Sequence, residues 1–321
     1  MSPPADPPAT SLRRRVGIVG AGRSRQGLGP FLARAFAAEG WRVSGVSGRD
    51  SAGAERAASE LAGGLGQPVA AFASARELAA TVDLLVVAAP VEAHLAGLDA
   101  ALAAGVPCLC EKPLVAAVER DAGLQRVAEF ARRGLALFEN CQWPFVLPAL
   151  LALHPGLVGA PVRSLAMGLS PALPGRAMVA DSLSHLLSVL QALVPLPPDT
   201  MPSSVRQRDR DPAAVQNEVA FAVRGAAGPV EVSLHLQVVP SQPRPAWLAV
   251  NGCRIDRRIG AGYAISFATP DGRSMNVRDP LQELVYRVGQ SLLPGPRERT
   301  EAPADLALRI RLYAAILQAL G

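Results

Sequence analysis

Along the first half of the chain, short apolar runs alternate with longer segments in which apolar residues recur at helical spacing. The apolar runs predict buried strands at residues 15–19, 41–46, 69–72, 82–88, 107–110 and 136–140. Helices are expected between them, at residues 30–39, 54–62, 75–80, 93–104 and 121–133. Strands and helices that alternate in this way form a parallel sheet with helices on both faces. We therefore expect an α/β domain over residues 15–142.

The pattern changes after about Trp143, where segments with a period of two replace the apolar runs. These segments predict antiparallel strands at residues 218–224, 230–239, 247–251 and 263–267. Asn251-Gly252 and Asp271-Gly272 are hairpin turn signals. One further strand at residues 163–169 and helices at 145–153, 181–193, 280–293 and 304–320 complete the pattern. Residues 143–321 are therefore predicted to be an α+β domain with a mainly antiparallel sheet.

Composition narrows the class of protein. A length of 321 residues is typical of about two domains. The formal charge of +5 fits either simple solubility or a preference for anionic ligands such as phosphates. The arginines are spread out, and the two short basic clusters, at residues 13–15 and 206–210, lack aromatic neighbours that could stack on bases. Nucleic acid is therefore not an expected partner.

Location and metal content follow from similar observations. Residues 1–14 are expected to be a disordered tail, since they are rich in proline and alanine and lack the apolar core of a signal peptide. No run of 18 apolar residues exists, so no membrane span is expected. The cysteines form no Cys-x-x-Cys pair and have no histidine at ligand spacing, which predicts reduced thiols and no metal site. We expect a cytoplasmic protein.

A glycine-rich loop follows the first predicted strand. Gly20 and Gly22 would let the backbone approach a pyrophosphate, and the next helix would supply N–H donors at its N-terminus. The usual third glycine is replaced by Arg25, so the loop looks lengthened, and Arg23, Ser24 and Arg25 could contact phosphate directly. The alternative is an ordinary glycine-rich turn. We favour a Rossmann-type dinucleotide-binding domain.

The end of the second strand bears on the choice between NAD and NADP. An NAD enzyme places a carboxylate here to bind the ribose 2′-hydroxyl. This chain instead has Ser47 and Arg49, and arginine binds phosphate in a two-pronged manner. NADP is therefore the expected cofactor. In the alternative interpretation, Asp50 turns inward to bind the ribose of NAD and Arg49 is a solvated surface residue.

Several motifs together resemble the glucose–fructose oxidoreductase/inositol dehydrogenase (Gfo/Idh/MocA) family. An Ala-Pro segment ending at Pro90 follows the fourth strand, then come His94 and the segment Glu111-Lys112-Pro113. Asp181-Ser-Leu-Ser-His185 resembles the Asp-x-x-x-His helix of that family. The resemblance implies a nicotinamide-dependent oxidoreductase whose second sheet mediates assembly into a homodimer or homotetramer.

Lys112, Asp181 and His185 are the predicted catalytic residues. Lys112 is the one lysine among 32 basic residues, and arginine substitutes poorly where a compact ammonium is needed. Asp181 and His185 are four residues apart on a helix and share a face, and histidine ordinarily titrates near neutrality. The resemblance implies that His185 is the general base, that Asp181 orients it or binds the substrate hydroxyl, and that Lys112 holds the substrate oxygen. It also implies a cis Lys112–Pro113 bond.

Other site residues are assigned by the same resemblance. Pro90 and His94 are expected beside the nicotinamide, and Glu111 either contacts the cofactor ribose or satisfies local backbone groups. The family often has an arginine where this chain has Gln142. Asn140 and Trp143, on either side of it, are candidates for the substrate pocket.

The sequence thus predicts an NADP-preferring oxidoreductase. It would transfer hydride between nicotinamide and a carbon bearing a hydroxyl or carbonyl, in a sugar, a polyol or a related small molecule. Two alternatives stay open. One is an imine or tetrapyrrole reductase on the same fold, and the other is a dinucleotide-binding sensor or regulator without turnover.

Overall fold

The computed structural model describes residues 14–22, 27–293 and 301–321. Most of the predicted tail, and the predicted phosphate contacts Arg23, Ser24 and Arg25, lie outside the described residues.

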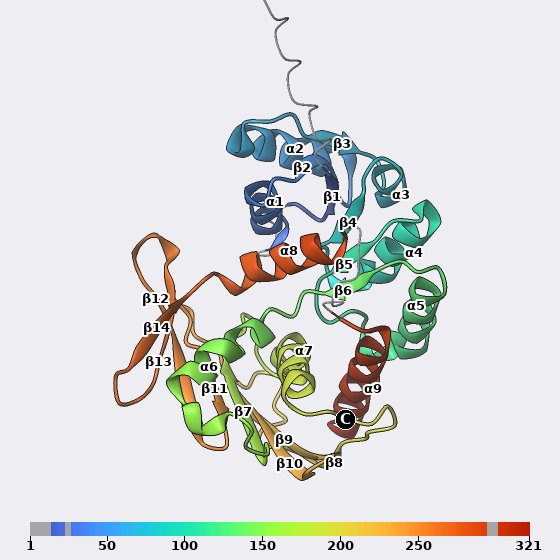
Figure 1. Ribbon diagram of the computed structural model, residues 1–321. Coiled ribbons are helices and arrows are strands. Elements are labelled where there is room, and N and C mark those ends of the chain that lie inside the picture. The colour runs from blue at the N-terminus through green and yellow to red at the C-terminus, as the bar shows by residue number, and fades with distance from the viewer. Residues whose placement is uncertain (1–13, 23–26, 294–300) are drawn as a thin grey trace, which may run out of the picture.

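The first half of the chain forms a parallel sheet of six strands in the order β3-β2-β1-β4-β5-β6 (Figure 1). Its strands are β1 (Arg15–Val19), β2 (Arg42–Ser47), β3 (Ala70–Phe72), β4 (Leu84–Val87), β5 (Cys108–Cys110) and β6 (Leu137–Glu139). The chain runs outward from β1 to β3 on one side and from β4 to β6 on the other. In such a sheet, ligands bind at the carboxyl ends of the strands beside the point where the order reverses.

Helices cover both faces of this sheet because alternate side chains of its strands point to opposite sides. Leu84 and Val86 pack in one core with α1, whereas Leu85 and Val87 pack in another with α4 and α5. The helices are α1 (Gly29–Ala38), α2 (Ser51–Leu65), α3 (Ala75–Ala79), α4 (His94–Ala104) and α5 (Arg120–Arg132), with short 3-10 turns η1 (Val91–Ala93) and η2 (Ala117–Glu119).

The second half forms a sheet of eight strands in the order β14-β13-β12-β11-β7-β10-β9-β8. Its pairs are antiparallel except β7 with β10, which confirms the predicted fold class. The strands are β7 (Ser164–Leu169), β8 (Ser203–Gln207), β9 (Gln216–Gly225), β10 (Gly228–Gln237), β11 (Trp247–Val250), β12 (Cys253–Ile259), β13 (Ile265–Ala268) and β14 (Ser274–Val277).

Helix α7 (Arg176–Leu193) lies on one face of this second sheet (Figure 1). Leu183, Leu186 and Leu190 of α7 are fully buried against Leu234 of β10 and Leu248 of β11. The remaining elements of this half are η3 (Trp143–Val146), α6 (Leu147–Leu153), η4 (Pro155–Leu157) and η5 (Ala261–Tyr263).

The last two helices join the halves. Val285 of α8 (Pro280–Ser291) packs in the same core as Phe36 of α1, under the first sheet. In α9 (Pro303–Ala319), Ile310 packs on the α5 side of the first sheet, and Ile316 packs in the core of the second. Both helices were predicted to belong to the second domain only, and the predicted domain limits stay a prediction.

Helix α7 begins five residues before the predicted start at residue 181. Gly175 precedes it with a φ of +62°, and a Cβ at that position would lie 2.1 Å from the carbonyl oxygen of Pro212. The two segments therefore pack so closely here that the residue before the helix has to be glycine. Since the helix begins before residue 181, Asp181 lies inside α7 and its side chain does not cap the helix.

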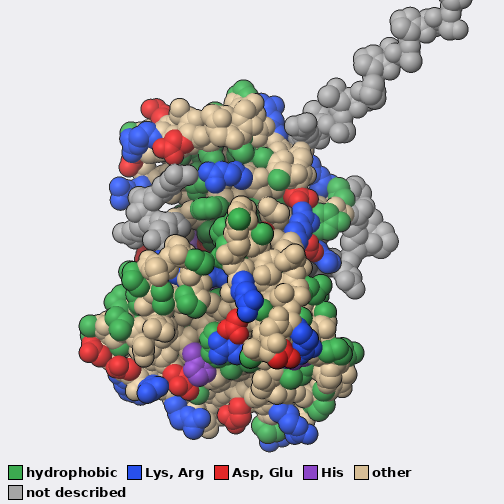
Figure 2. All heavy atoms as spheres, turned by 90° about the vertical axis from the view of Figure 1, so that its left-hand side faces the viewer, with side chains coloured by type: hydrophobic (Ala, Val, Ile, Leu, Met, Phe, Trp, Pro, Cys, Tyr) green, Lys and Arg blue, Asp and Glu red, His purple; other side chains and the backbone are tan. Residues whose placement is uncertain are grey.

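Charge is distributed evenly on the visible surface. On the face that Figure 2 shows, basic and acidic side chains are interspersed without a broad patch of one sign. Among the described residues, no helix has both the length and the apolar character needed to cross a bilayer.

Candidate active site

Lys112 and Asp181 bring the two halves of the chain into contact. Lys112 follows the carboxyl end of β5, and its bond to Pro113 is cis. Its Nζ donates to Oδ1 of Asp181 at 2.5 Å and to the carbonyl oxygen of Asp181 at 2.8 Å. The lysine side chain is 12% exposed and the aspartate side chain 54% exposed. The ammonium is therefore shielded, whereas the carboxylate remains accessible to solvent.

His185 lies one helical turn after Asp181 and is half-buried. Its Nδ1 is buried and has no hydrogen-bond partner among the described residues. Burial, together with the nearby charge of Lys112, lowers the pKa of His185 to about 3. The imidazole is therefore neutral at physiological pH. This differs from the expectation of a histidine that titrates near neutrality, because that expectation ignored desolvation.

Replacing His185 by asparagine should change how stability depends on pH. Folding lowers the pKa of His185 from 6.5 to about 3, because the folded state disfavours the protonated ring. The stability that accompanies the neutral ring is therefore fully present above pH 6.5. That stabilisation is lost as the pH falls, by up to about 1.4 kcal/mol per pH unit. The difference in unfolding free energy between wild type and His185→Asn should therefore shrink from pH 7 to pH 5, measured by urea denaturation. The matched control is His235→Asn, at a half-exposed histidine. If the difference in unfolding free energy between wild type and His185→Asn stays constant from pH 7 to pH 5, the pKa of His185 is not lowered on folding.

Glu111 and Asn140 form a second polar pair beside the lysine. Asn140 Nδ2 donates to Oε1 of Glu111, and the Asn140 backbone N–H donates to the carbonyl oxygen of Cys110 at 2.7 Å. Burial raises the pKa of Glu111 to about 7, although Lys112 and Asn140 oppose the shift. Oδ1 of Asn140 is buried without a partner among the described residues. Glu111 is therefore a group in this site that can gain or lose a proton near neutrality.

His94 connects the end of β4 to the Lys-Pro turn. Its Nδ1 lies 2.9 Å from the carbonyl oxygen of Pro113, and its Nε2 lies 2.9 Å from that of Ala89. The residue is 1% exposed. This position supports a structural role beside the site. Pro90, the other residue predicted here, is exposed and precedes η1.

The described part of the glycine loop is tightly packed on one side and open on the other. Gly20 has a φ of +86°, and a Cβ there would lie 2.7 Å from the backbone of Ala88 and Ala89. A Cβ on Gly29, in the first turn of α1, would lie 2.6 Å from the carbonyl oxygen of Gly20. No described atom, in contrast, lies within 4 Å of a Cβ built on Gly22. This arrangement fits a backbone that a dinucleotide approaches closely.

Ser47, Arg49 and Asp50 lie at the carboxyl end of β2 and just beyond it. Ser47 is 2% exposed, and its Oγ has no partner among the described residues. The side chain of Arg49 is 94% exposed. Oδ1 of Asp50 accepts a 2.7 Å hydrogen bond from Gly53 N–H and so caps α2. The carboxylate that would bind an NAD ribose in the alternative interpretation is therefore engaged in capping.

A buried ionic network behind the site was missed by the sequence analysis. Nη1 of Arg309 on α9 lies 2.8 Å from Oε2 of Glu139 on β6 and 2.5 Å from Oε1 of Glu301. Oε1 of Glu139 accepts a 2.9 Å hydrogen bond from the N–H of Leu114, two residues after the lysine. Nε of Arg309 donates to Gln191 of α7 at 2.8 Å. The network therefore ties α9 to both elements that carry the candidate residues. A charged residue inside the apolar stretch Leu308-Arg309-Ile310 was the available signal.

Trp143 does not lie in an open pocket. It is 6% exposed and belongs to the core of the second half, where its ring meets Phe267 edge-on at 6.1 Å. The structure thus gives it a packing role, and its predicted substrate contact gains no support.

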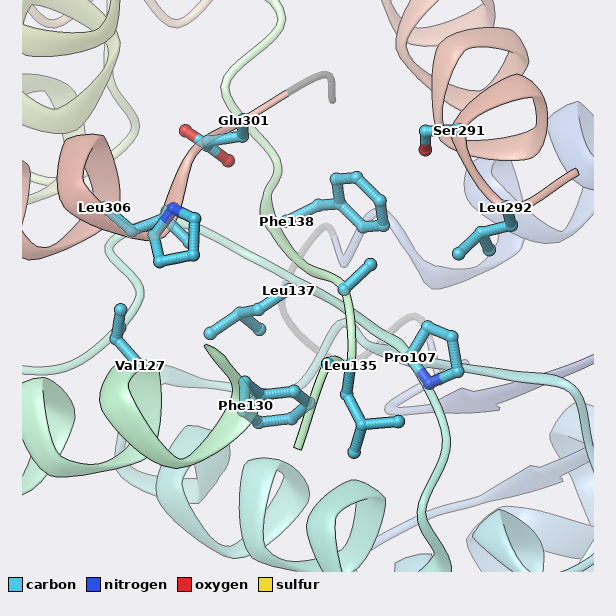
Figure 3. Close-up of a pocket in the computed structure, with 13 residues that line it drawn as sticks. Pro107, Val127, Phe130, Leu135, Leu137, Phe138, Ser291, Leu292, Glu301 and Leu306 are labelled. Atoms are coloured by element: carbon cyan, nitrogen blue, oxygen red, sulfur yellow. The ribbon is translucent and has the colours of Figure 1, made fainter. Parts of the chain in front are cut away.

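A pocket whose lining residues are mainly hydrophobic lies elsewhere, beside the edge strand β6 (Figure 3). Phe130, Leu137 and Leu306 line it, and the carboxylate at its rim, Glu301, is already paired with Arg309. The predicted site residues are not part of its described lining. Among the described residues, no group of three or more His, Cys, Asp or Glu side chains is arranged to hold a metal ion.

Comparison with known proteins identifies relatives of this chain. Residues 14–138 match a family model described as "Oxidoreductase family, NAD-binding Rossmann fold". A UDP-N-acetylglucosamine 3-dehydrogenase from Acidithiobacillus ferrooxidans is 33% identical over 176 residues, which are 55% of this chain and 51% of the relative. A D-apiose dehydrogenase from Rhizobium rhizogenes is 24% identical over 214 residues, 62% of this chain and 61% of the relative. The chain therefore spans between half and two thirds of the length of the curated relatives it matches.

A solved structure extends the likeness to the whole chain. The crystal structure of GenD2 from gentamicin A biosynthesis, in complex with NAD, superposes with a TM-score of 0.67 at 20% identity and covers 94% of this chain and 93% of that one. At this identity the likeness shows a shared fold. Residues 14–138 therefore match the NAD-binding Rossmann-fold domain of the Gfo/Idh/MocA family of oxidoreductases, and over the rest of the chain the likeness is one of fold.

Proposed function

We propose that the protein is a nicotinamide-dependent dehydrogenase that acts on a carbon bearing a hydroxyl or carbonyl group, in a sugar, a polyol or a related small molecule. The observation that carries this proposal is the contact of Lys112 with Asp181, one helical turn from His185. It brings a cation from the dinucleotide-binding half together with a carboxylate and a neutral imidazole from the second sheet half. The relatives that are named dehydrogenases of sugar compounds support the same class of substrate.

The residues present fit a dinucleotide. Open space at Gly22, the close approach of Gly20 to β4, and the unpartnered Oγ of Ser47 all lie where the sheet order predicts the cofactor. A bound nicotinamide would accept or donate the hydride. Glu111 and Asn140 lie at the adjoining strand ends β5 and β6, where Asn140 retains an unpartnered Oδ1 for a ligand.

The side chains can also act on the substrate oxygen. An ammonium has three donors, and Lys112 uses two of them on Asp181. The third is available to hold the oxygen on the reacting carbon and to stabilise negative charge there. His185 is neutral and has a nitrogen lone pair for a hydroxyl proton, although its lowered pKa makes it a weaker base than a free imidazole. Asp181 would hold Lys112 in place and remain accessible to the substrate.

A substrate screen tests this function. The protein is incubated with sugars, polyols and cyclic imines and with each nicotinamide cofactor, and the absorbance of the reduced cofactor is followed. Turnover of at least one alcohol, absent from a Lys112→Met blank, is the expected result. Reduction of imines alone would favour the imine reductase alternative. Cofactor binding without any turnover would favour a sensor or regulator.

We also propose a preference for NADP. Arg49 offers an exposed guanidinium to a 2′-phosphate, beside the buried and unpartnered Oγ of Ser47. The carboxylate of Asp50 caps α2 and lies 3.8 Å from Nε of Arg49. The variant Arg49→Ala should lower kcat/KM with NADP by about tenfold and leave kcat/KM with NAD nearly unchanged. Arg42→Ala, at the opposite end of β2, is the matched control. If wild type uses NAD as well as or better than NADP, the preference is wrong.

A homodimer or homotetramer is proposed as well. The face of the second sheet opposite α7 carries the half-buried side chains of His235, Trp247 and Arg254, with the guanidinium of Arg254 4.3 Å above the tryptophan ring. Such a stacked aromatic surface is typical of protein interfaces.

A further inference from the structure

Arg257 is a charged residue on the face of the second sheet that α7 covers. Ile255, two residues earlier on β12, is fully buried in the core beneath α7. Alternate residues of a strand point to the same side, so Arg257 shares the face of Ile255. Across the sheet, Arg257 pairs with Phe267 of β13, whose ring packs on Trp143.

The level of Arg257 along the strands places it near the start of α7. Its N–H donates to the carbonyl oxygen of Ala246 at 2.8 Å, and the next residue, Trp247, pairs with Gly168 near the carboxyl end of β7. The chain leaves β7 at this end and enters α7, whose N-terminal half carries Asp181. Arg257 therefore projects from the floor of the sheet at the end where the candidate active site lies.

The hydrogen-bonding capacity of Arg257 is largely unused. Its Nη2 donates to the carbonyl oxygen of Arg244 at 2.9 Å. Its Nε is buried without a partner, and it forms no ion pair with a carboxylate among the described residues. The acidic charge in its vicinity is that of Asp279, whose carboxylate caps α8 through Leu281 N–H at 2.9 Å. Arg257 is half-buried, and a guanidinium that is partly shielded from water without a paired anion is costly unless a ligand supplies the anion.

The electrostatics agree with this placement. Burial lowers the pKa of Arg257 itself. Its charge also contributes, after burial and after Lys112, to lowering the pKa of His185. Arg257 thus lies within electrostatic reach of the imidazole, and the site carries a second cation besides Lys112.

We propose that Arg257 binds an anionic group of the substrate, a phosphate or a carboxylate, while Lys112, Asp181 and His185 face the hydroxyl-bearing carbon of the same molecule. The planar fork of arginine suits either group, because two N–H donors can reach two oxygens at once. The inference rests on the proposed function only because both place a substrate beside Lys112, Asp181 and His185. The substrate class becomes an acidic sugar or a sugar phosphate in place of a neutral polyol.

Binding measurements on the full-length protein test the inference without turnover. Affinities of glucose, glucuronate and glucose 1-phosphate are measured by calorimetry at one ionic strength, with the reduced cofactor present, for wild type, Arg257→Gln and Arg258→Gln. Arg258 is the matched control, since it is the exposed next residue on the opposite face of β12. Wild type and Arg258→Gln should bind at least one anionic sugar about tenfold or more tightly than glucose, and Arg257→Gln should lose this difference.

The possible results distinguish the anion-binding role of Arg257 from the proposed dehydrogenase function. Preference for phosphate alone or for carboxylate alone identifies the anion and supports the inference. Equal affinity for glucose and both anionic sugars in wild type, or a preference that survives in Arg257→Gln, overturns it. Anion-dependent binding in a protein that shows no turnover would contradict the proposed function and leave the role of Arg257 standing. Unchanged melting temperature and cofactor affinity show that Arg257→Gln is folded, and Arg257→Lys, which keeps the charge, should retain part of the preference.

Discussion

Replacing Lys112 by methionine is expected to lower kcat/KM by roughly 10²- to 10⁴-fold while the dinucleotide still binds. The reason is geometric. The Nζ of Lys112 is the cation held against Asp181 by two hydrogen bonds, and its third donor is the one available to the substrate oxygen. Methionine keeps much of the volume of the side chain and removes all of these donors. Steady-state kinetics give kcat/KM, and the fluorescence of the reduced nicotinamide gives its Kd.

Arginine at this position should not restore activity. A guanidinium is larger and planar and spreads its donors over a fork, so it cannot reproduce a compact ammonium between Asp181 and a substrate. Since Lys112 is the one lysine of the chain, an amine-directed acylating reagent should inactivate the wild type through this side chain, and substrate should protect it. Activity of Lys112→Arg within a few-fold of wild type would remove the lysine from the mechanism. The salt bridge is open to solvent on the aspartate side, so the unfolding free energy should change by less than about 1 kcal/mol.

Replacing Arg309 by methionine is expected to lower the free energy of unfolding by about 3–5 kcal/mol at pH 8. The side chains of Arg309, Glu139 and Glu301 are 6%, 2% and 12% exposed, so the variant would leave two carboxylates buried without their cation. Burial raises the pKa of Glu301 even with Arg309 present, and without the guanidinium the protonated form is favoured further. A carboxyl group whose pKa is higher in the folded than in the unfolded state contributes stability at low pH. This contribution is lost as the pH rises. The deficit measured by urea unfolding should therefore be smaller at pH 5 than at pH 8.

A triple variant separates lost charge pairing from lost packing. Arg309→Met combined with Glu139→Gln and Glu301→Gln removes the charges together, and should recover most of the lost stability. Two results would contradict a stabilising role for the ionic network. One is a recovery of less than about 1 kcal/mol in the triple variant, and the other is a loss of stability in Arg309→Met that does not vary with pH. The matched surface control is Arg311→Met on the same helix, whose charged end donates to the carbonyl oxygen of Pro198 near solvent. Its effect should stay within about 1 kcal/mol.

The alternation of apolar runs and helical segments was sufficient to predict the first sheet. All of its strands were expected within two residues of their observed limits, because strands buried on both faces are recognisable as short, nearly continuous apolar runs. The second sheet was harder. β8, β12 and β14 were not predicted, and β14 is a polar edge strand whose residues are mostly exposed, so hydrophobic periodicity does not mark it.

For the candidate site, the sequence identified the residue types but not their surroundings. Lys112, Asp181 and His185 were selected from local motifs, and motif spacing cannot show that the lysine would contact the aspartate across 69 residues. The lowered pKa of His185 and the raised pKa of Glu111 arise from burial by other elements. The position of Trp143 also depends on other elements. A tryptophan after a strand end can line a pocket or fill a core, and the structure shows Trp143 buried in the core.

By itself, the sequence determined the class of fold, the glycine-rich loop after the first strand and the one lysine, because each depends on local backbone chemistry or on periodicity within a single segment. Only the tertiary structure decided which charges are paired and which are not. Asp50 caps a helix, Arg309 joins two buried carboxylates, and Arg257 projects toward the site without a partner anion among the described residues. Desolvation and ion pairing depend on which side chains from distant segments approach within a few ångströms, and such distances are set by the packing of the whole chain.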